Sequence, residues 1–184
     1  AWIFETAGKY PGFMIGGIAE NFGTSCCEGK GDFFITEGDE YDTAFFDKRS
    51  KFFHYLPEQL ILNNLEFDHA DIFNSLDEIK KSFQLMLRLI PKRGLIAANG
   101  DDPNVQTVLH SVNSPVVSFG LEEQCDVRAL NIKTSASGTK FEVIDKRLGE
   151  FSKEYEFELN LAGKYNVLNA LGVITLARYN GISD

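Results

Sequence analysis

The stretch that decides the fold spans Asp32–Asp71 and reads DFFITEGDEYDTAFFDKRSKFFHYLPEQLILNNLEFDHAD. It contains two apolar runs, Asp32–Thr36 and Gln59–Leu62. The apolar residues in each run are continuous and do not alternate with polar ones, which is typical of strands covered on both faces, as in a parallel sheet flanked by helices. We therefore predict that both runs are strands of an α/β sheet, and that they are neighbours in it.

A cluster of acidic and amide residues follows each of these two predicted strands. The first cluster is Glu37–Asp42 (EGDEYD) and the second is Asn63–Asp71 (NNLEFDHAD). Ligands of open α/β sheets bind just beyond the carboxyl ends of the strands, so both clusters lie where a site is expected. Oxygen ligands together with one imidazole suit a hard divalent cation that keeps several waters and bridges to phosphates.

The residues that we expect to hold this cation are Glu37 and His69, with Asp68 or Asp71 orienting the imidazole. An acidic cluster after a strand can also be only a solvated loop, and Asp71 can be only the N-cap of the next helix. We favour the functional interpretation because two such clusters coincide with two strand ends. It requires that the two strands bring the glutamate and the imidazole to the same edge.

Composition and charge limit the classes of function. The 184 residues include 18 Lys and Arg against 27 Asp and Glu, so the net charge is −9. This charge argues against nucleic-acid partners and against an anionic membrane surface. No apolar run approaches the ~18 residues of a membrane span. The three cysteines, Cys26, Cys27 and Cys125, fit neither a disulfide framework nor a zinc site, and we expect a cytoplasmic protein.

The rest of the chain predicts a doubly wound, mostly parallel α/β sheet in a single domain over residues 1–184. The helices expected before the last third of the chain are Ala1–Ala7, Asp71–Leu89 and one that begins at Pro103 with Asp102 as its N-cap. The further strands are Phe13–Ile18, Gly94–Asn99 and Val116–Phe119. Three alternating runs then predict a small antiparallel meander, Asp126–Ser135, Thr139–Asp145 and Tyr155–Leu161, before a last helix, Tyr165–Tyr179.

The loop Asn21–Gly31 superficially resembles a phosphate-binding loop. Five residues, where the motif has four, separate Gly23 from Gly29, and a glycine, where the motif has Ser or Thr, follows Lys30. Such a loop also leads into a helix N-terminus, whereas this one leads into a predicted strand. We therefore reject this assignment.

Two further groups of polar residues are candidate binding residues. The mixed aromatic and basic segment Thr43–Tyr55 contains Lys48 and Arg49, which could neutralise a substrate phosphate or carboxylate, although a solvated turn with a hydrophobic anchor is the alternative. Asn166 and Asn169 share one face of the first turn of the last helix. They could cap that helix or contact an adenine edge, and the sequence does not decide between these roles.

Four segments resemble, in order, the motifs of the Mur ligase central domain: EGDEYD at Glu37–Asp42, NLEFDH at Asn64–His69, NGDD at Asn99–Asp102 and GKYNVLNA at Gly163–Ala170. The resemblance covers nearly the whole chain. The run Tyr41–Phe52 is more specific. It is similar to the branch that joins the murein tripeptide L-alanyl-γ-D-glutamyl-meso-diaminopimelate to UDP-N-acetylmuramate in cell-wall recycling.

The resemblance implies an ATP-dependent amide ligase that forms an acyl phosphate and needs Mg²⁺. By analogy, Glu37 and His69 hold Mg²⁺ near the γ-phosphate, and Asn64 and Asp68 complete the catalytic group. The nucleotide's base and ribose are bordered by Asn99, Asp101, Asn166 and Asn169. The resemblance assigns substrate binding to Tyr41, Asp42, Lys48 and Arg49.

This sequence departs from the family pattern at three points. The Gly-Lys-Thr phosphate loop expected just before the first helix is absent, Phe83 stands where several members have a carbamate-bearing lysine, and Tyr165 stands for the usual histidine. We expect the chain to be one central domain of a longer protein with its own N- and C-terminal domains. Two alternatives stay open: the sister ligase that adds L-alanine to UDP-N-acetylmuramate, and a non-catalytic nucleotide- or metal-binding module.

Overall fold

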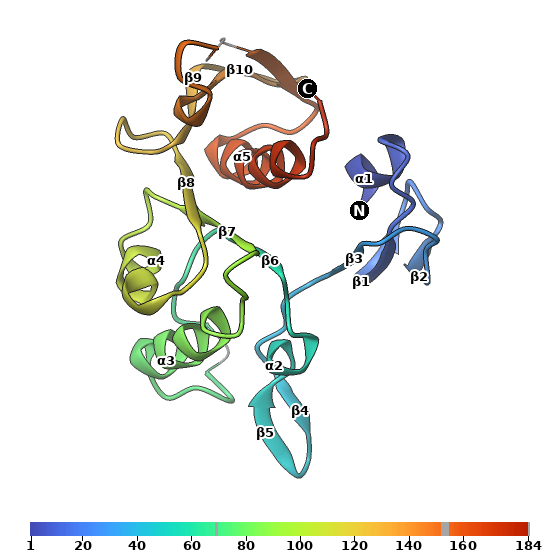
Figure 1. The fold of residues 1–184 in the computed structure, drawn as a ribbon, viewed down its shortest axis with the longest axis vertical. Helices are drawn as coiled ribbons and strands as arrows, with labels where there is room; N and C mark the ends of the chain where they lie inside the picture. Colours follow the sequence, from blue (N-terminus) through green and yellow to red (C-terminus); the bar gives the residue numbers. More distant parts are fainter. Residues whose placement is uncertain (69, 152–154, 184) are drawn as a thin grey trace.

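The computed structural model describes residues 1–68, 70–151 and 155–183 (Figure 1). His69, one of the two predicted metal ligands, therefore lies outside the described residues. The helices are α1 (Trp2–Thr6), α2 (Phe52–Tyr55), α3 (Leu76–Leu87), α4 (Pro103–Val108) and α5 (Lys164–Tyr179), with 3₁₀ turns η1 (Leu109–Ser111) and η2 (Lys146–Phe151). The strands are β1 (Gly12–Ala19), β2 (Thr24–Cys27), β3 (Phe34–Thr36), β4 (Asp42–Ala44), β5 (Asp47–Ser50), β6 (Gln59–Leu62), β7 (Leu95–Asn99), β8 (Val116–Gly120), β9 (Val127–Ser135), β10 (Gly138–Asp145) and β11 (Tyr155–Leu159).

The main sheet has six strands in the order β11-β10-β9-β8-β7-β6. The pairs β6–β7, β7–β8 and β8–β9 are parallel, whereas β9–β10 and β10–β11 are antiparallel. The predicted mostly parallel α/β sheet and the three antiparallel strands are therefore confirmed. The three antiparallel strands do not form a separate sheet, however, because β9 pairs with β8 in the parallel half and with β10 in the antiparallel half.

Helices cover both faces of this sheet, as the continuous apolar strands predicted. Strand β7 shows the reason, since all five of its residues are buried. Ile96 and Ala98 join the core beneath α3 and α4, while Leu95 and Ala97 join the core beneath α5. Successive side chains of a strand point to opposite faces, so one short strand supplies two cores. Figure 1 shows α3 and α4 on one side of β7 and β8 and α5 on the other.

A second sheet of three strands, in the order β2-β1-β3, lies beside the main one (Figure 1). The prediction that Asp32–Thr36 and Gln59–Leu62 are neighbouring strands is wrong, because β3 pairs with β1 and β6 pairs with β7. The small sheet has its own aromatic contacts, with ring centroids 4.9 Å apart for Phe4 and Phe33 and 4.3 Å apart for Phe13 and Phe22.

Three other segments differ in the structure from their predicted form. Helix α3 begins at Leu76 and not at Asp71, because Ser75 accepts a hydrogen bond from the Glu78 amide while Glu78 accepts one from the Asn74 amide. The predicted loop Asn21–Gly31 contains β2, which pairs with β1. The segment Thr43–Tyr55 forms the β4–β5 hairpin and α2.

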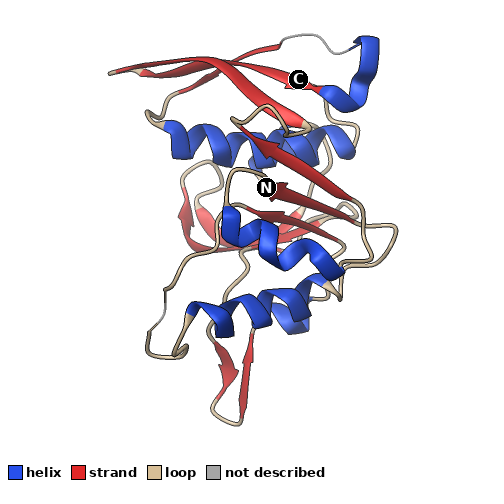
Figure 2. Ribbon diagram, turned by 90° about the vertical axis from the view of Figure 1, so that its left-hand side faces the viewer, coloured by secondary structure: helices blue, strands red, loops and turns tan. Residues whose placement is uncertain are grey.

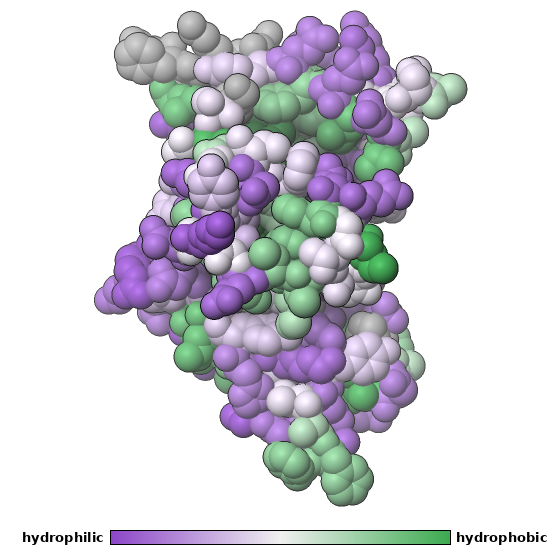
Figure 3. Space-filling view, turned by 90° about the vertical axis from the view of Figure 1, so that its right-hand side faces the viewer, coloured by the Kyte–Doolittle hydropathy of each residue, from purple (hydrophilic) through white to green (hydrophobic). Residues whose placement is uncertain are grey.

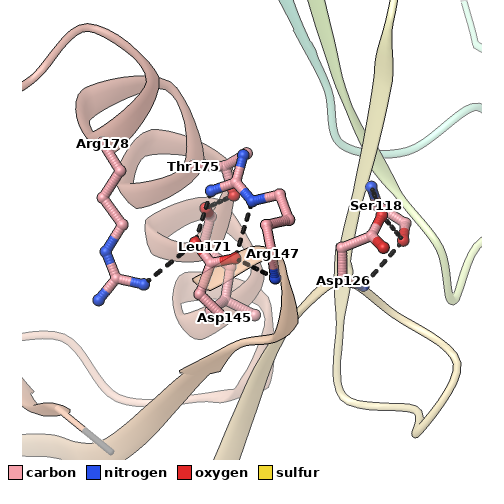
Figure 4. Close-up of polar contacts among 7 residues, drawn as sticks. All are labelled: Ser118, Asp126, Asp145, Arg147, Leu171, Thr175 and Arg178. Atoms are coloured by element: carbon pink, nitrogen blue, oxygen red, sulfur yellow. Dashed lines mark hydrogen bonds and ion pairs between the residues drawn. The ribbon is translucent and has the colours of Figure 1, made fainter. Parts of the chain in front are cut away.

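A buried carboxylate links the antiparallel half of the main sheet to α5 (Figure 4). Asp145 is 1% exposed and accepts hydrogen bonds from Arg147 Nε at 2.7 Å and Nη2 at 2.5 Å, with Arg178 Nη1 of α5 at 3.4 Å. Burial raises the pKa of Asp145, but the hydrogen bonds and charge of Arg147, with the charge of Arg178, lower it below its ordinary value overall.

We predict that Asp145→Asn lowers the free energy of unfolding by about 2–3 kcal/mol, because it leaves the partly buried guanidinium groups of Arg147 and Arg178 without their charged partner. Denaturant unfolding at pH 7 measures this. The stabilisation by Asp145 is present above the ordinary carboxyl pKa of 3.8 and is lost as the pH falls below it, since the folded-state pKa is lowered. The difference in free energy of unfolding between wild type and Asp145→Asn should therefore become smaller at acid pH.

The chain provides a matched control in Asp47→Asn. Asp47 makes the same paired contact with a residue two positions on, accepting from Arg49 Nε at 2.9 Å and Nη2 at 2.7 Å, but Arg49 is 65% exposed. Solvent-exposed pairs contribute little to stability. If Asp47→Asn lowered the free energy of unfolding as much as Asp145→Asn, burial of Asp145 would not explain its contribution to stability.

Candidate functional site

The two acidic clusters meet in one pocket, although their strands belong to different sheets. Glu40 of the first cluster and Asn64, Glu66 and Asp68 of the second line a pocket of about 140 Å³. Its apolar wall consists of Leu65, Phe73, Ile79 and Phe83. Acidic groups on one side and packed side chains from the α3 core on the other produce a small, polar and negatively charged site.

The α4 N-terminus fixes the second cluster. Asp102 is the N-cap predicted from the sequence, and its Oδ1 accepts from the Asn104 and Val105 amides at 2.8 and 3.0 Å. Its Oδ2 accepts from the Leu65 amide at 3.2 Å, and Asn104 Nδ2 donates to the Leu65 carbonyl at 2.9 Å. Both backbone groups of Leu65 are therefore bound, and this buried residue anchors the loop that carries Asn64 and Glu66.

Glu37 lies at the end of β3, where its Oε2 accepts a hydrogen bond from the Gly16 amide of β1 at 3.1 Å. A Cβ at position 16 would lie 2.8 Å from this oxygen, so glycine permits the approach. The described residues that line the acidic pocket do not include Glu37. Its pairing with His69 around one cation stays a prediction, as does the proposed orientation of that imidazole by Asp68 or Asp71.

The donor set in the acidic pocket fits a loosely held hard cation better than a closed metal cage. Glu40, Glu66 and Asp68 supply carboxylate oxygens, but within the described ranges no three His, Cys, Asp or Glu side chains gather closely enough to form a ligand set. Mg²⁺ commonly takes one or two carboxylates and completes its shell with water and substrate phosphates. The site therefore fits an ion that arrives with a phosphate group.

The predicted nucleotide residues Asn99 and Asp101 hold two neighbouring turns, Asn99 the one after β7 and Asp101 the one after β8. Asn99 is buried and accepts a hydrogen bond from the Asp101 amide at 3.0 Å. Asp101 accepts from the Leu121 amide at 2.6 Å and the Glu122 amide at 3.2 Å, and the Cys125 thiol donates to it at 3.5 Å. Burial and the charge of Asp101 raise the pKa of Cys125 to about 12. Asn99 and Asp101 thus both have hydrogen-bond partners within the protein.

The predicted residues on α5 are held differently. Asn166 Nδ2 donates to the Ala162 carbonyl at 2.8 Å, while Asn169 Oδ1 accepts from Asn63 Nδ2 at 2.9 Å and connects α5 to the end of β6. Asn63 Oδ1 is buried and has no hydrogen-bond partner among the described residues. A buried acceptor without a hydrogen-bond donor destabilises the folded state, so this oxygen favours the binding of a ligand with a donor group near Asn63 and Asn169. Asn63 is the first residue of the second cluster and was not among the predicted site residues.

The four predicted substrate residues belong to the β4–β5 hairpin and its base (Figure 2). Lys48 pairs with Asp42 at 2.7 Å, and Arg49 pairs with Asp47 at 2.7 Å. Tyr41 lies at the base, where its carbonyl accepts from the Lys51 amide at 3.1 Å. Both predicted cations therefore already have acidic partners, of which Asp47 was not predicted. The signal was its spacing of two from Arg49, which places both on one face of a strand.

The described residues contain no helix that is long and apolar enough to cross a bilayer.

Comparison with known proteins identifies relatives that match nearly the whole length of this chain. The model of the Mur ligase middle domain matches residues 22–177. The UDP-N-acetylmuramate--L-alanyl-gamma-D-glutamyl-meso-2,6-diaminoheptandioate ligase of Escherichia coli K12 is 43% identical over 183 residues, which are 99% of this chain and 38% of that protein.

Two other relatives agree with this match. The UDP-N-acetylmuramate--L-alanine ligase of Chromobacterium violaceum is 34% identical over all of this chain and 38% of its own length. The crystal structure of UDP-N-acetylmuramate:L-alanyl-gamma-D-glutamyl-meso-diaminopimelate ligase from Neisseria meningitides is 42% identical, with a TM-score of 0.85, and covers 99% of this chain and 56% of that one. The chain thus spans about two fifths of the curated relatives that it matches. It belongs to the Mur ligase family, in which it corresponds to the middle domain.

Proposed function

We propose that the protein is an ATP-dependent ligase that joins L-alanyl-γ-D-glutamyl-meso-diaminopimelate to UDP-N-acetylmuramate. The observation that carries this proposal is the meeting of the two acidic clusters, one on each sheet, in a single pocket. The 43% identity to a ligase named for this reaction supports the choice of substrates. The three free cysteines of this acidic chain suit the cytoplasm, where we place the reaction.

In this reaction the carboxylate of the nucleotide sugar takes the γ-phosphoryl group of ATP, and the tripeptide amine displaces phosphate from the acyl phosphate. Mg²⁺, when bound, supplies charge neutralisation to the phosphates. We assign the ion to Glu37 and His69, which are not among the described lining residues of the acidic pocket, and assign the positioning of the reacting groups to Asn64 and Asp68, which line it. Catalysis of this kind depends on positioning and electrostatics more than on covalent chemistry of the protein.

We assign the nucleotide to the neighbourhood of Asn99, Asp101, Asn166 and Asn169. Asn63 Oδ1 offers a buried acceptor there, next to Asn169. Gly172 allows this arrangement, because a Cβ at that position would lie 2.7 Å from Ile61 Cγ2 and 3.3 Å from Asn63 Oδ1. The hydrogen bonds of Asn99 and Asp101 give these two residues the role of shaping the loop beside the nucleotide.

We also propose that the full-length protein supplies a strand between the two sheets, followed by the phosphate loop. Strand β3 is an edge of the small sheet and β6 is an edge of the main sheet. Leu60, Ile61 and Leu62 make β6 a continuous apolar edge, whereas native edges are normally protected by charge, proline or a covering element. A strand that pairs with both edges would protect them, and the full-length sequence would show Gly-Lys-Thr or Gly-Lys-Ser after it.

We predict that Glu37→Gln in the full-length enzyme lowers turnover at saturating Mg²⁺ by about 10²–10³-fold, as for loss of a key electrostatic group. The amide can still accept the hydrogen bond from the Gly16 amide, so the structural contact is kept while the charge is lost. Steady-state kinetics measure the effect. The matched control is Glu28→Gln, an exposed acid after β2, which should leave turnover unchanged.

A Glu37→Gln enzyme with wild-type turnover would show that Glu37 has only its structural contact with β1. Unchanged turnover for Ala substitutions at both Glu37 and His69 would favour the non-catalytic module.

The two ligase candidates differ in the amine that they use. With UDP-N-acetylmuramate and ATP, we expect the full-length protein to have a kcat/KM at least about 10²-fold higher for the tripeptide than for L-alanine, because the larger substrate offers more groups to bind. Phosphate release with each amine measures this. The reverse preference would favour the L-alanine ligase, to which the chain is 34% identical in the Chromobacterium relative.

We predict that the 184-residue chain alone has no ligation activity, because its described residues provide no phosphate loop and it matches only the middle part of its relatives. The same phosphate-release assay tests this, with circular dichroism to confirm folding. Product formation by the isolated chain would refute the prediction and with it the proposed need for further domains.

A further inference from the structure

The β4–β5 hairpin carries the most exposed aromatic residues of the described chain at its tip. Phe45 and Phe46 are 93% and 91% exposed. The hairpin projects from the body in Figures 1 and 2, and its tip is the hydrophobic projection at the bottom of Figure 3. Two adjacent phenylalanines present about 400 Å² of largely apolar surface, which is unfavourable in water and typical of a contact site.

The hairpin is held in shape by contacts that do not use its tip. An isolated two-stranded hairpin is only marginally stable, so such contacts matter. Lys48 pairs with Asp42 across the strands, and Thr43 Oγ1 donates to the Arg49 carbonyl at 2.8 Å. At the base, Lys51 pairs with Asp39 at 2.7 Å. The tip is therefore presented by a braced arm and is not part of a loose loop.

Charge and area restrict what can cover this tip. Within β4 and β5 the charges of Asp42 and Asp47 cancel those of Lys48 and Arg49, and the whole chain has a net charge of −9. An anionic membrane would therefore gain no electrostatic attraction. A tip-to-tip dimer would bury about 800 Å², roughly half of the about 1,600 Å² of a standard stable interface.

A domain of the same polypeptide needs no such area, because the linkage gives it a high effective concentration, on the order of mM. The relatives extend well beyond the region that this chain matches, which is 38% of the Escherichia coli protein. The base of the hairpin also adjoins the acidic pocket through Glu40. A domain docked on the hairpin tip would therefore be separated from this pocket by the length of one short hairpin.

We propose that Phe45 and Phe46 insert into an apolar recess on another domain of the full-length protein and so hold that domain beside the acidic pocket. This inference depends on the proposed presence of further domains, but not on the identity of the substrates. The hairpin is then a docking arm, and Phe45 and Phe46 are positioning residues that need not touch substrate.

The test compares hydrogen exchange in full-length wild type and in full-length Phe45→Ser/Phe46→Ser. We expect exchange to rise about tenfold both in the hairpin and in one segment outside the 184 residues, because the contact that protects both is lost. The control is Leu85→Ser, which changes another exposed apolar residue, on α3, and should leave both regions unchanged. The mutant's circular dichroism and the unchanged exchange of β7 show that the fold is kept.

Several outcomes would overturn the proposal. Exchange that rises only in the hairpin, or in neither region, would show that no domain of the protein covers the tip. A wild-type dimer that becomes monomeric in the double variant on sedimentation would assign the tip to a second copy. Binding of wild type, but not of the variant, to vesicles of zwitterionic or anionic lipid would assign it to a membrane. Lack of ligase activity in the wild type would refute the proposed function and leave these readouts unaffected.

Discussion

The arrangement of the site depends on one carboxylate, that of Asp102. One of its oxygens caps α4 and the other holds the Leu65 amide, so a single side chain connects the turn after β7 to the loop after β6. This connection helps to hold the exposed Asn64 and Glu66 in place relative to the sheet. Because Asn104 also binds the Leu65 carbonyl, the loop is held from both of its backbone groups. The acidic pocket is thus built from a helix terminus as much as from strand ends.

Sequence patterns revealed the main sheet because burial on both faces leaves a clear signal. The apolar residues of β6 and β7, the N-cap Asp102 and the last helix were all expected where they occur. Strand adjacency left no such signal, since β3 and β6 are both short and apolar and nothing local states their partners. The clusters that follow these two strands nevertheless meet in one pocket.

The candidate site was less predictable than the fold, because polar residues can serve either the protein or a ligand. Asn99 and Asp101 match a family motif, yet their described contacts are with neighbouring backbone amides and one thiol. Lys48 and Arg49 suggested an anion site, and the structure pairs each with an aspartate nearby in sequence. Asn63 shows the opposite case, since only coordinates reveal that its buried oxygen lacks a donor among the described residues.

The surroundings of Cys125 have a chemical consequence. A thiol with a pKa of about 12 is almost entirely protonated at neutral pH, and only thiolates attack electrophiles and peroxides at useful rates. Cys26 and Cys27, by contrast, lie exposed on β2, at the edge of the small sheet. Maleimide dyes and spin labels should therefore attach to this strand and spare the turn that Asp101 holds, so movements of the small sheet can be followed spectroscopically without genetic removal of the third cysteine.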